Sequence, residues 1–164
     1  MAPLARRTWS PRGQTPVLCQ RTRSHQKVSV VAALCVSPDR GEVHLYFPPL
    51  QRKLDATAIV DFLRALLQQV PGPLVLVWDR VQAHRGQTTS AWLARHPRLH
   101  PHLLPPYAPE LNPVEYVWSY LKTNRLANSA PQELEVLVHA AHRHARSLQR
   151  RHDLLRSFLA HSPL

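Results

Sequence analysis

The sequence of 164 residues is poor in several residue types, and each shortage narrows the class of protein. Only four glycines are present, which argues against a fibrous or low-complexity chain. The two cysteines, Cys19 and Cys35, lack the short spacing of a zinc or redox motif, so we expect buried thiols in a reducing compartment. The longest apolar run, residues 28–36, is far too short to cross a bilayer, and no signal peptide follows the basic N-terminus. We therefore expect a soluble intracellular protein with no membrane partner.

Acidic residues are also scarce. Ten Asp and Glu stand against 21 Lys and Arg, which gives a formal net charge of +11. Such a charge favours a polyanionic partner, nucleic acid first, because cationic side chains release the counterions condensed on phosphates. Most of the basic residues are arginine in a chain rich in Ala, Leu and Pro, and GC-rich coding gives the same composition. By itself, the charge leaves both explanations open.

The periodicity of apolar residues predicts alternating strands and helices. Strands are expected at 27–36, 42–47, 74–78 and 99–104. Helices are expected at 55–70, 88–96, 112–126 and 131–159. A hairpin followed by alternating elements predicts an α/β fold, a mixed sheet with helices on both faces. We divide the chain into a basic irregular N-terminal arm or loop (1–26), a core (27–128) and a basic helical C-terminal segment (129–164).

Two carboxylates stand at informative positions. Asp79 ends the apolar strand 74–78, where α/β sheets place their ligands, and Glu115 lies 36 positions later, in the first turn of a helix. The intervening helix and strand are expected to bring the chain back beside its starting point. Two such carboxylates can hold a divalent cation. The alternatives are structural, because an Asp after a strand is often a helix cap and a Glu in a first turn favours the helix dipole.

The residues around Glu115 carry a resemblance. Residues 104–118, LPPYAPELNPVEYVW, followed by Leu121 and Lys122, resemble the third-carboxylate motif of mariner-like DDE transposases, above all the bacterial insertion-sequence transposases of the 630 family. As in that family, a histidine, His84, follows Asp79 by five positions. Residues 7–16, RTWSPRGQTP, resemble the loop after the family's first catalytic strand. The resemblance covers roughly residues 5–128.

The resemblance implies an RNase H-like fold and a DDE endonuclease and strand-transfer domain that acts in transposition of an insertion sequence. Asp79 and Glu115 would be catalytic ligands of Mg²⁺, with Mn²⁺ as a substitute. The implied partners are DNA, as transposon ends and target, and a second copy or a full-length transposase, in the bacterial cytoplasm at the nucleoid.

Other residues near the motif have two interpretations each. His84 is expected near the metal site or the DNA, or is an ordinary helix histidine. Lys122 contacts a phosphate or is a solvated lysine. Asn112 is expected to cap the helix that carries Glu115, and it is also a candidate active-site or DNA contact. Packing against the protein is the favoured interpretation of Tyr107 and Trp118, and stacking on a base is the alternative.

The family's first carboxylate has no counterpart. The loop that should follow its strand begins at Arg7, which leaves no room for the strand or its Asp. We therefore expect an RNase H-like sheet that lacks the first catalytic strand, and a chain that is inactive alone. The alternative function is a catalytically inactive remnant that binds DNA or a transposase.

The C-terminal segment carries a second candidate surface. Its arginines form a DNA-binding face or a solvated basic helix, and the candidates are Arg143, Arg146, Arg150 and Arg151. His139 and His142 have helical i, i+3 spacing, but no Cys or acid completes a zinc site, so we do not expect one.

Overall fold

The computed structural model describes residues 9–15, 29–48, 54–125 and 134–163. The strands are β1 (Ala33–Val36), β2 (Val43–Tyr46), β3 (Leu74–Trp78) and β4 (Leu99–Leu103). The α-helices are α1 (Ala56–Gln69), α2 (Gln82–Arg85), α3 (Gln87–Leu93), α4 (Pro113–Tyr120), α5 (Leu134–Gln149) and α6 (His152–His161). A 3₁₀ turn, η1 (Pro109–Leu111), precedes α4, and a π-helical turn, η2 (Leu121–Arg125), follows it. No described helix is long and apolar enough to cross a membrane.

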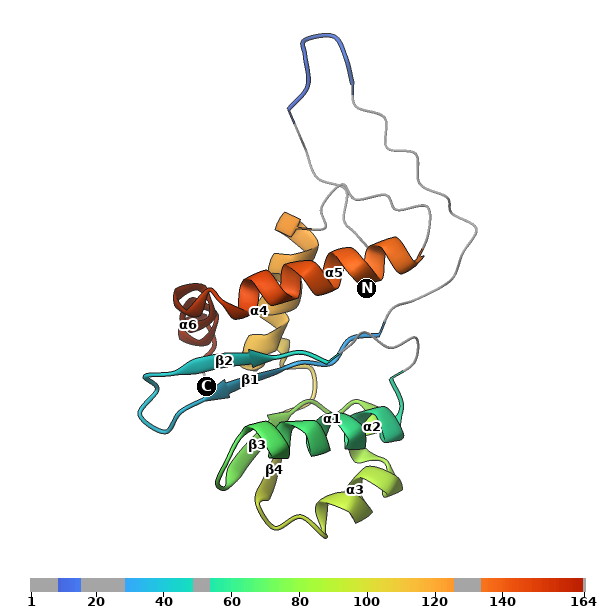
Figure 1. Ribbon diagram of the computed structural model, residues 1–164, viewed down its shortest axis with the longest axis vertical. Coiled ribbons are helices and arrows are strands. Elements are labelled where there is room, and N and C mark those ends of the chain that lie inside the picture. Colours follow the sequence, from blue (N-terminus) through green and yellow to red (C-terminus); the bar gives the residue numbers. More distant parts are fainter. Residues whose placement is uncertain (1–8, 16–28, 49–53, 126–133, 164) are drawn as a thin grey trace.

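Strands β1 and β2 form an antiparallel hairpin whose two faces both meet helices (Figure 1). Val43 and Leu45 point to one face and are almost fully buried. They pack against a core from α4, η2, α5 and α6, made of Val117, Leu121, Leu148, Leu155 and Phe158. Ala33 and Tyr46 contribute to a second core around Ile59, Phe62 and Leu63 of α1, together with Trp78 and Leu99. Because alternate strand residues point to opposite faces, the hairpin joins the two cores.

Strands β3 and β4 form a parallel pair, in register from Leu74 opposite Leu99 to Trp78 opposite Leu103. One face of the pair packs on α1 and α3 through Leu74, Leu76 and Trp78. The crossover between the strands runs through α2 and α3, as a parallel connection requires. The α/β class is therefore confirmed. The described strands form two separate pairs, where the sequence predicted one mixed sheet without its first catalytic strand.

One short helix was not predicted from the sequence, and the last predicted helix is divided in two. Ahead of the helix expected at 88–96 lies the short α2, and Gly86, in an extended conformation, separates it from α3. The fully buried Thr89 donates from Oγ1 to the Ala83 carbonyl at 2.7 Å and ties the two helices together. The helical stretch expected at 131–159 ends as α5 and resumes as α6, with Arg151 outside helical geometry. This break lets both helices direct leucines into the same core.

Candidate active site

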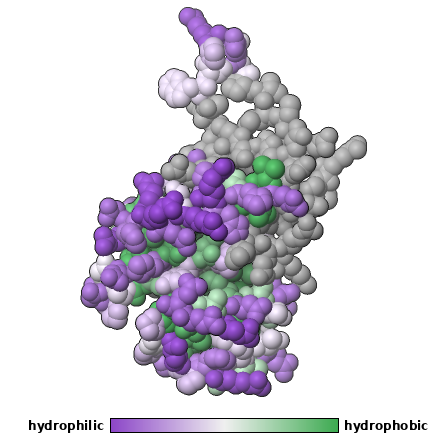
Figure 2. Space-filling model, in the orientation of Figure 1, coloured by the Kyte–Doolittle hydropathy of each residue, from purple (hydrophilic) through white to green (hydrophobic). Residues whose placement is uncertain are grey.

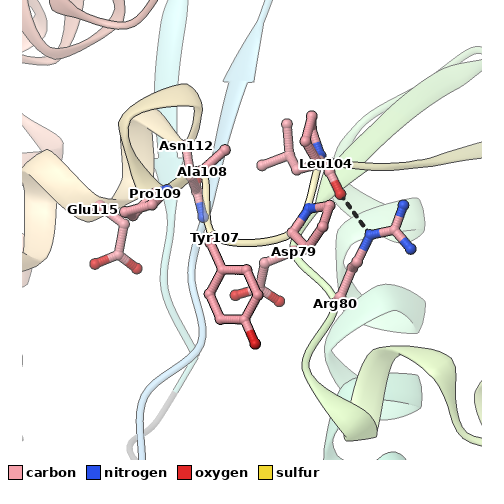
Figure 3. Close-up of a pocket in the computed structure, with 10 residues that line it drawn as sticks. Asp79, Arg80, Leu104, Tyr107, Ala108, Pro109, Asn112 and Glu115 are labelled. Atoms are coloured by element: carbon pink, nitrogen blue, oxygen red, sulfur yellow. Dashed lines mark hydrogen bonds between the residues drawn. The ribbon is translucent and has the colours of Figure 1, made fainter.

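A cleft with a cavity of about 200 Å³ lies where the end of β3 meets the start of α4 (Figure 3). Both candidate carboxylates line it. The complete lining consists of Asp79, Arg80, Leu104, Pro105, Pro106, Tyr107, Ala108, Pro109, Asn112 and Glu115. The structure thus brings together the two acids that lie 36 positions apart in the sequence.

Asp79 is held in place by its own strand end. Its Oδ1 accepts a hydrogen bond from the Val81 backbone N–H at 3.1 Å and lies 2.7 Å from Nδ1 of His84. The imidazole of His84 stacks on the Trp78 indole, with ring centroids 4.5 Å apart and planes 10° from parallel. Trp78 belongs to the core around α1, so this stack fixes His84 and, through it, Asp79. His84 itself does not line the cleft and is 14% exposed.

Glu115 is held by the capped start of α4. Asn112 is confirmed as the cap, because its Oδ1 accepts a hydrogen bond from the Val114 N–H at 3.2 Å, and Pro113 occupies the first turn. Val117, two residues beyond Glu115, is fully buried in the core on the hairpin. The cap at Asn112 and the burial of Val117 together fix the position and the direction of the helix that carries Glu115.

The electrostatics of the cleft suit a cation. Partial burial is the main cause that raises the pKa of Glu115, and the negative charge of Asp79 raises it further, whereas the Lys122 ammonium lowers it. The two carboxylates therefore repel each other across the cleft, and a divalent cation between them would relieve that repulsion. Lys122 is half-buried on η2 and does not line the cleft.

Oxygen donors of this kind are the ligands that magnesium and manganese prefer. Among the described residues, no group of three or more His, Cys, Asp or Glu side chains is placed to hold a metal ion. The cleft thus offers a two-carboxylate site, and the described part of the chain adds no third acid to it.

The candidate arginines lie elsewhere. Arg143 and Arg146 are exposed on one face of α5, three positions apart, and the exposed Arg150 directly follows the helix. Figure 2 shows hydrophilic side chains over α5 on the face turned to the viewer. Arg151, just beyond α5, donates to the Tyr120 hydroxyl at 2.9 Å. None of the four lines the cleft.

Sequence reasoning missed one cleft residue, Arg80, and misjudged another, Tyr107. Arg80 donates from Nε to the Leu104 carbonyl at 2.8 Å and ties the end of β3 to the loop that follows β4. Tyr107 is fully exposed, so the expectation that it packs against the protein was wrong. Its place among prolines is a sequence signal for a loop, where no regular element covers a side chain. Trp118 does pack, with its ring 6.1 Å from that of Phe47.

Comparisons with known proteins agree with this architecture. The family model of the DDE superfamily endonucleases matches residues 2–138. Among solved structures, the chain is similar to the Mos1 mariner paired end complex with Mn, with a TM-score of 0.50 and 14% sequence identity. The match covers 99% of this chain and 52% of that one, so this chain spans about half the length of its structural relative. No curated protein matches the sequence. The RNase H-like fold expected from the mariner resemblance is confirmed, and the chain belongs to the DDE superfamily endonuclease family.

Proposed function

We propose that the chain is a transposase catalytic domain that binds DNA at the cleft, with Asp79 and Glu115 as ligands of a divalent cation. The observation that carries the proposal is the convergence of these two carboxylates on one open cleft, from elements that pack in different cores. The family match and the manganese of the similar paired end complex support it. Mg²⁺ is the expected ion, and Mn²⁺ is the experimental substitute.

The chain's own residues define what the cleft can do. His84 and the Val81 N–H hold Oδ1 of Asp79, so this carboxylate is preorganised and need not be ordered when a ligand binds. A bound cation would supply charge neutralisation at a phosphate and activation of an attacking water or 3′-hydroxyl. Arg80 places a further positive charge at the cleft. The exposed arginines of α5 and the net charge of +11 provide the wider attraction for the phosphate backbone.

A binding module without catalysis is the second candidate. The observation that favours it is that the described residues supply two carboxylates and no third metal-binding side chain at the cleft. In this case the domain would bind DNA, or a full-length transposase, without cutting. We propose that the chain alone cleaves DNA poorly or not at all, because two acids hold and orient a metal less completely than three.

The first experiment measures metal binding to the whole chain by thermal unfolding with Mn²⁺. At about ten times the dissociation constant, binding should stabilise the fold by about 1.4 kcal/mol and raise Tm by about 3–6 °C. Asp79→Asn and Glu115→Gln should both abolish the rise. Glu110→Gln is the matched control, since Glu110 is an exposed acid in η1 outside the cleft lining. A response that survives Asp79→Asn contradicts the proposed site.

The second experiment separates the two functions on DNA. Nicking of supercoiled plasmid that requires Mn²⁺ and disappears in Glu115→Gln identifies an endonuclease. Binding that weakens steeply with salt, without any nicking, identifies the binding module.

A further inference from the structure

Tyr107 differs from the other tyrosines of the described chain in having no covered surface. Tyr46 is half-buried against the core around α1. Tyr116 donates to the His161 carbonyl at 3.1 Å, and the Tyr120 hydroxyl accepts from Arg151. Tyr107 is 100% exposed, although burial of an aromatic ring is strongly favourable. Nothing in the packing of the described residues accounts for an aromatic side chain at this position.

The backbone of Tyr107 is also strained. Its φ of 58° lies in the left-handed region, which costs a bulky side chain free energy that a glycine would not lose. Pro105, Pro106 and Pro109 restrict the backbone of the loop on both sides of this residue. The loop thus carries an exposed ring on a backbone conformation that costs free energy. Such outliers often mark a functional contact.

The position of the ring suggests what it contacts. Tyr107 lines the same cleft as Asp79 and Glu115, and Figure 3 shows the ring reaching into the space between α4 and the end of β3. Arg80 lines the cleft as well and adds a cationic group beside it. An exposed aromatic face next to two carboxylates and a guanidinium matches the three parts of a nucleotide site. The ring suits a base, the guanidinium suits a phosphate, and the carboxylates suit the metal that bridges to the phosphate.

We propose that Tyr107 is a stacking platform for an unpaired nucleobase next to the phosphate bound at the cleft. This inference rests on the proposed function and specifies its substrate as DNA that is single-stranded or locally unpaired at the reacting position. A base inside a duplex has both faces covered by its neighbours, so the ring can stack only on a terminal or flipped-out base. Stacking needs the aromatic face and not the hydroxyl, and it tolerates any base, since every base has such a face.

The test compares binding of the whole chain to a short single-stranded oligonucleotide and to a blunt duplex, in Mn²⁺ at fixed salt. Tyr107→Ala and Tyr107→Leu should each weaken single-strand binding about tenfold, whereas Tyr107→Phe should change it by less than about twofold. The leucine variant keeps apolar surface and removes the aromatic face, so it is the matched control for simple burial. Folding should be unaffected, because the side chain is exposed, and circular dichroism melts check this.

A double-mutant cycle gives the sharper result. The oligonucleotide is prepared with a single abasic site, moved along its length. At the position that stacks on Tyr107, removal of the base should weaken wild-type binding and leave Tyr107→Ala binding unchanged, because the contact has already been lost. Equal affinity of wild type and Tyr107→Ala for the intact oligonucleotide overturns the stacking role and leaves the proposed function standing. So does an equal further loss in Tyr107→Ala at every abasic position. Absence of any DNA binding by the wild type overturns both.

Discussion

Arg98 provides a quantitative test of how the end of β3 is positioned. Its guanidinium donates to three carbonyls around the end of α1 and the turn after it, Leu67 at 3.3 Å, Val70 at 2.7 Å and Gly72 at 3.0 Å. Its own carbonyl accepts from the Leu74 N–H at 2.7 Å, where β3 starts. This one residue therefore ties the turn between α1 and β3 to the beginning of β4. Asp79 lies at the opposite end of β3 from this turn.

The magnitude follows from the type of contact. A hydrogen bond contributes about 0.5–1.5 kcal/mol net, and a cation at a helix C-terminus about 0.3–1 kcal/mol. Arg98 is exposed, so water replaces part of each contact, and one side chain is ordered once for all three bonds. We therefore expect Arg98→Ala to lower the free energy of unfolding by about 1–2 kcal/mol, or about 2–8 °C in Tm. Arg98→Lys should recover less than half of this lost stability, because one ammonium group cannot reproduce the planar array of donors of the guanidinium.

Urea unfolding of purified chain, followed by circular dichroism, measures this difference. Arg95→Ala is the control, since Arg95 is also exposed, lies in the same connection and carries the same charge. A difference between Arg98→Ala and Arg95→Ala of less than about 0.5 kcal/mol would refute the reasoning, because surface substitutions without specific contacts fall within that range.

Three further predictions concern single groups. The raised pKa of Glu115 means that the fold favours its protonated form, so ionisation above the unfolded-state pKa lowers stability. Without metal, Glu115→Gln should therefore raise Tm at pH 7 and leave it unchanged at about pH 3, and a lower Tm at pH 7 contradicts this. Asn112→Ala should lower the free energy of unfolding, measured in urea, by about 1 kcal/mol because the cap of α4 is lost. Asn112→Asp should retain most of the stability that the cap provides. Burial raises the pKa of the Cys35 thiol from 9.0 to about 11. With Cys19→Ser as background, iodoacetamide at pH 8 should then alkylate the native chain about 100-fold more slowly than the unfolded chain, and similar rates by mass spectrometry contradict this.

The local signals in the sequence located several elements closely. The strand predicted at 74–78 is β3 itself, because a continuous apolar run between a proline-rich turn and Asp79 has no competing interpretation. The helix predicted at 55–70 differs from α1 by one residue at each end, since its apolar period and the Asp55 cap are both local. The cap at Asn112 is equally local. These features depend on residues close to each other in the sequence, so they can be predicted from the sequence alone.

Features that depend on distant contacts were decided by the tertiary structure. The short helix α2 has no buried residue and no apolar period, and it forms because Thr89 and the stack of His84 on Trp78 hold it. The break between α5 and α6 follows from the shape of the core that both helices fill. The pairing of strands into two separate sheets could not be predicted either, because register and neighbours are set by packing on α1 and not by the strand sequences.

The cleft shows the same division. The sequence by itself determined the family and the two acids, because the motif around Glu115 and the spacing to Asp79 are written in the chain. Whether the acids meet was decided by the two cores that the hairpin joins, since Asp79 follows Trp78 of one core and Glu115 precedes Tyr116 and Val117 of the other. The exposure of Tyr107 and its disfavoured backbone conformation were seen only in the tertiary structure. Local chemistry thus fixed the parts of the site, and long-range packing fixed their arrangement.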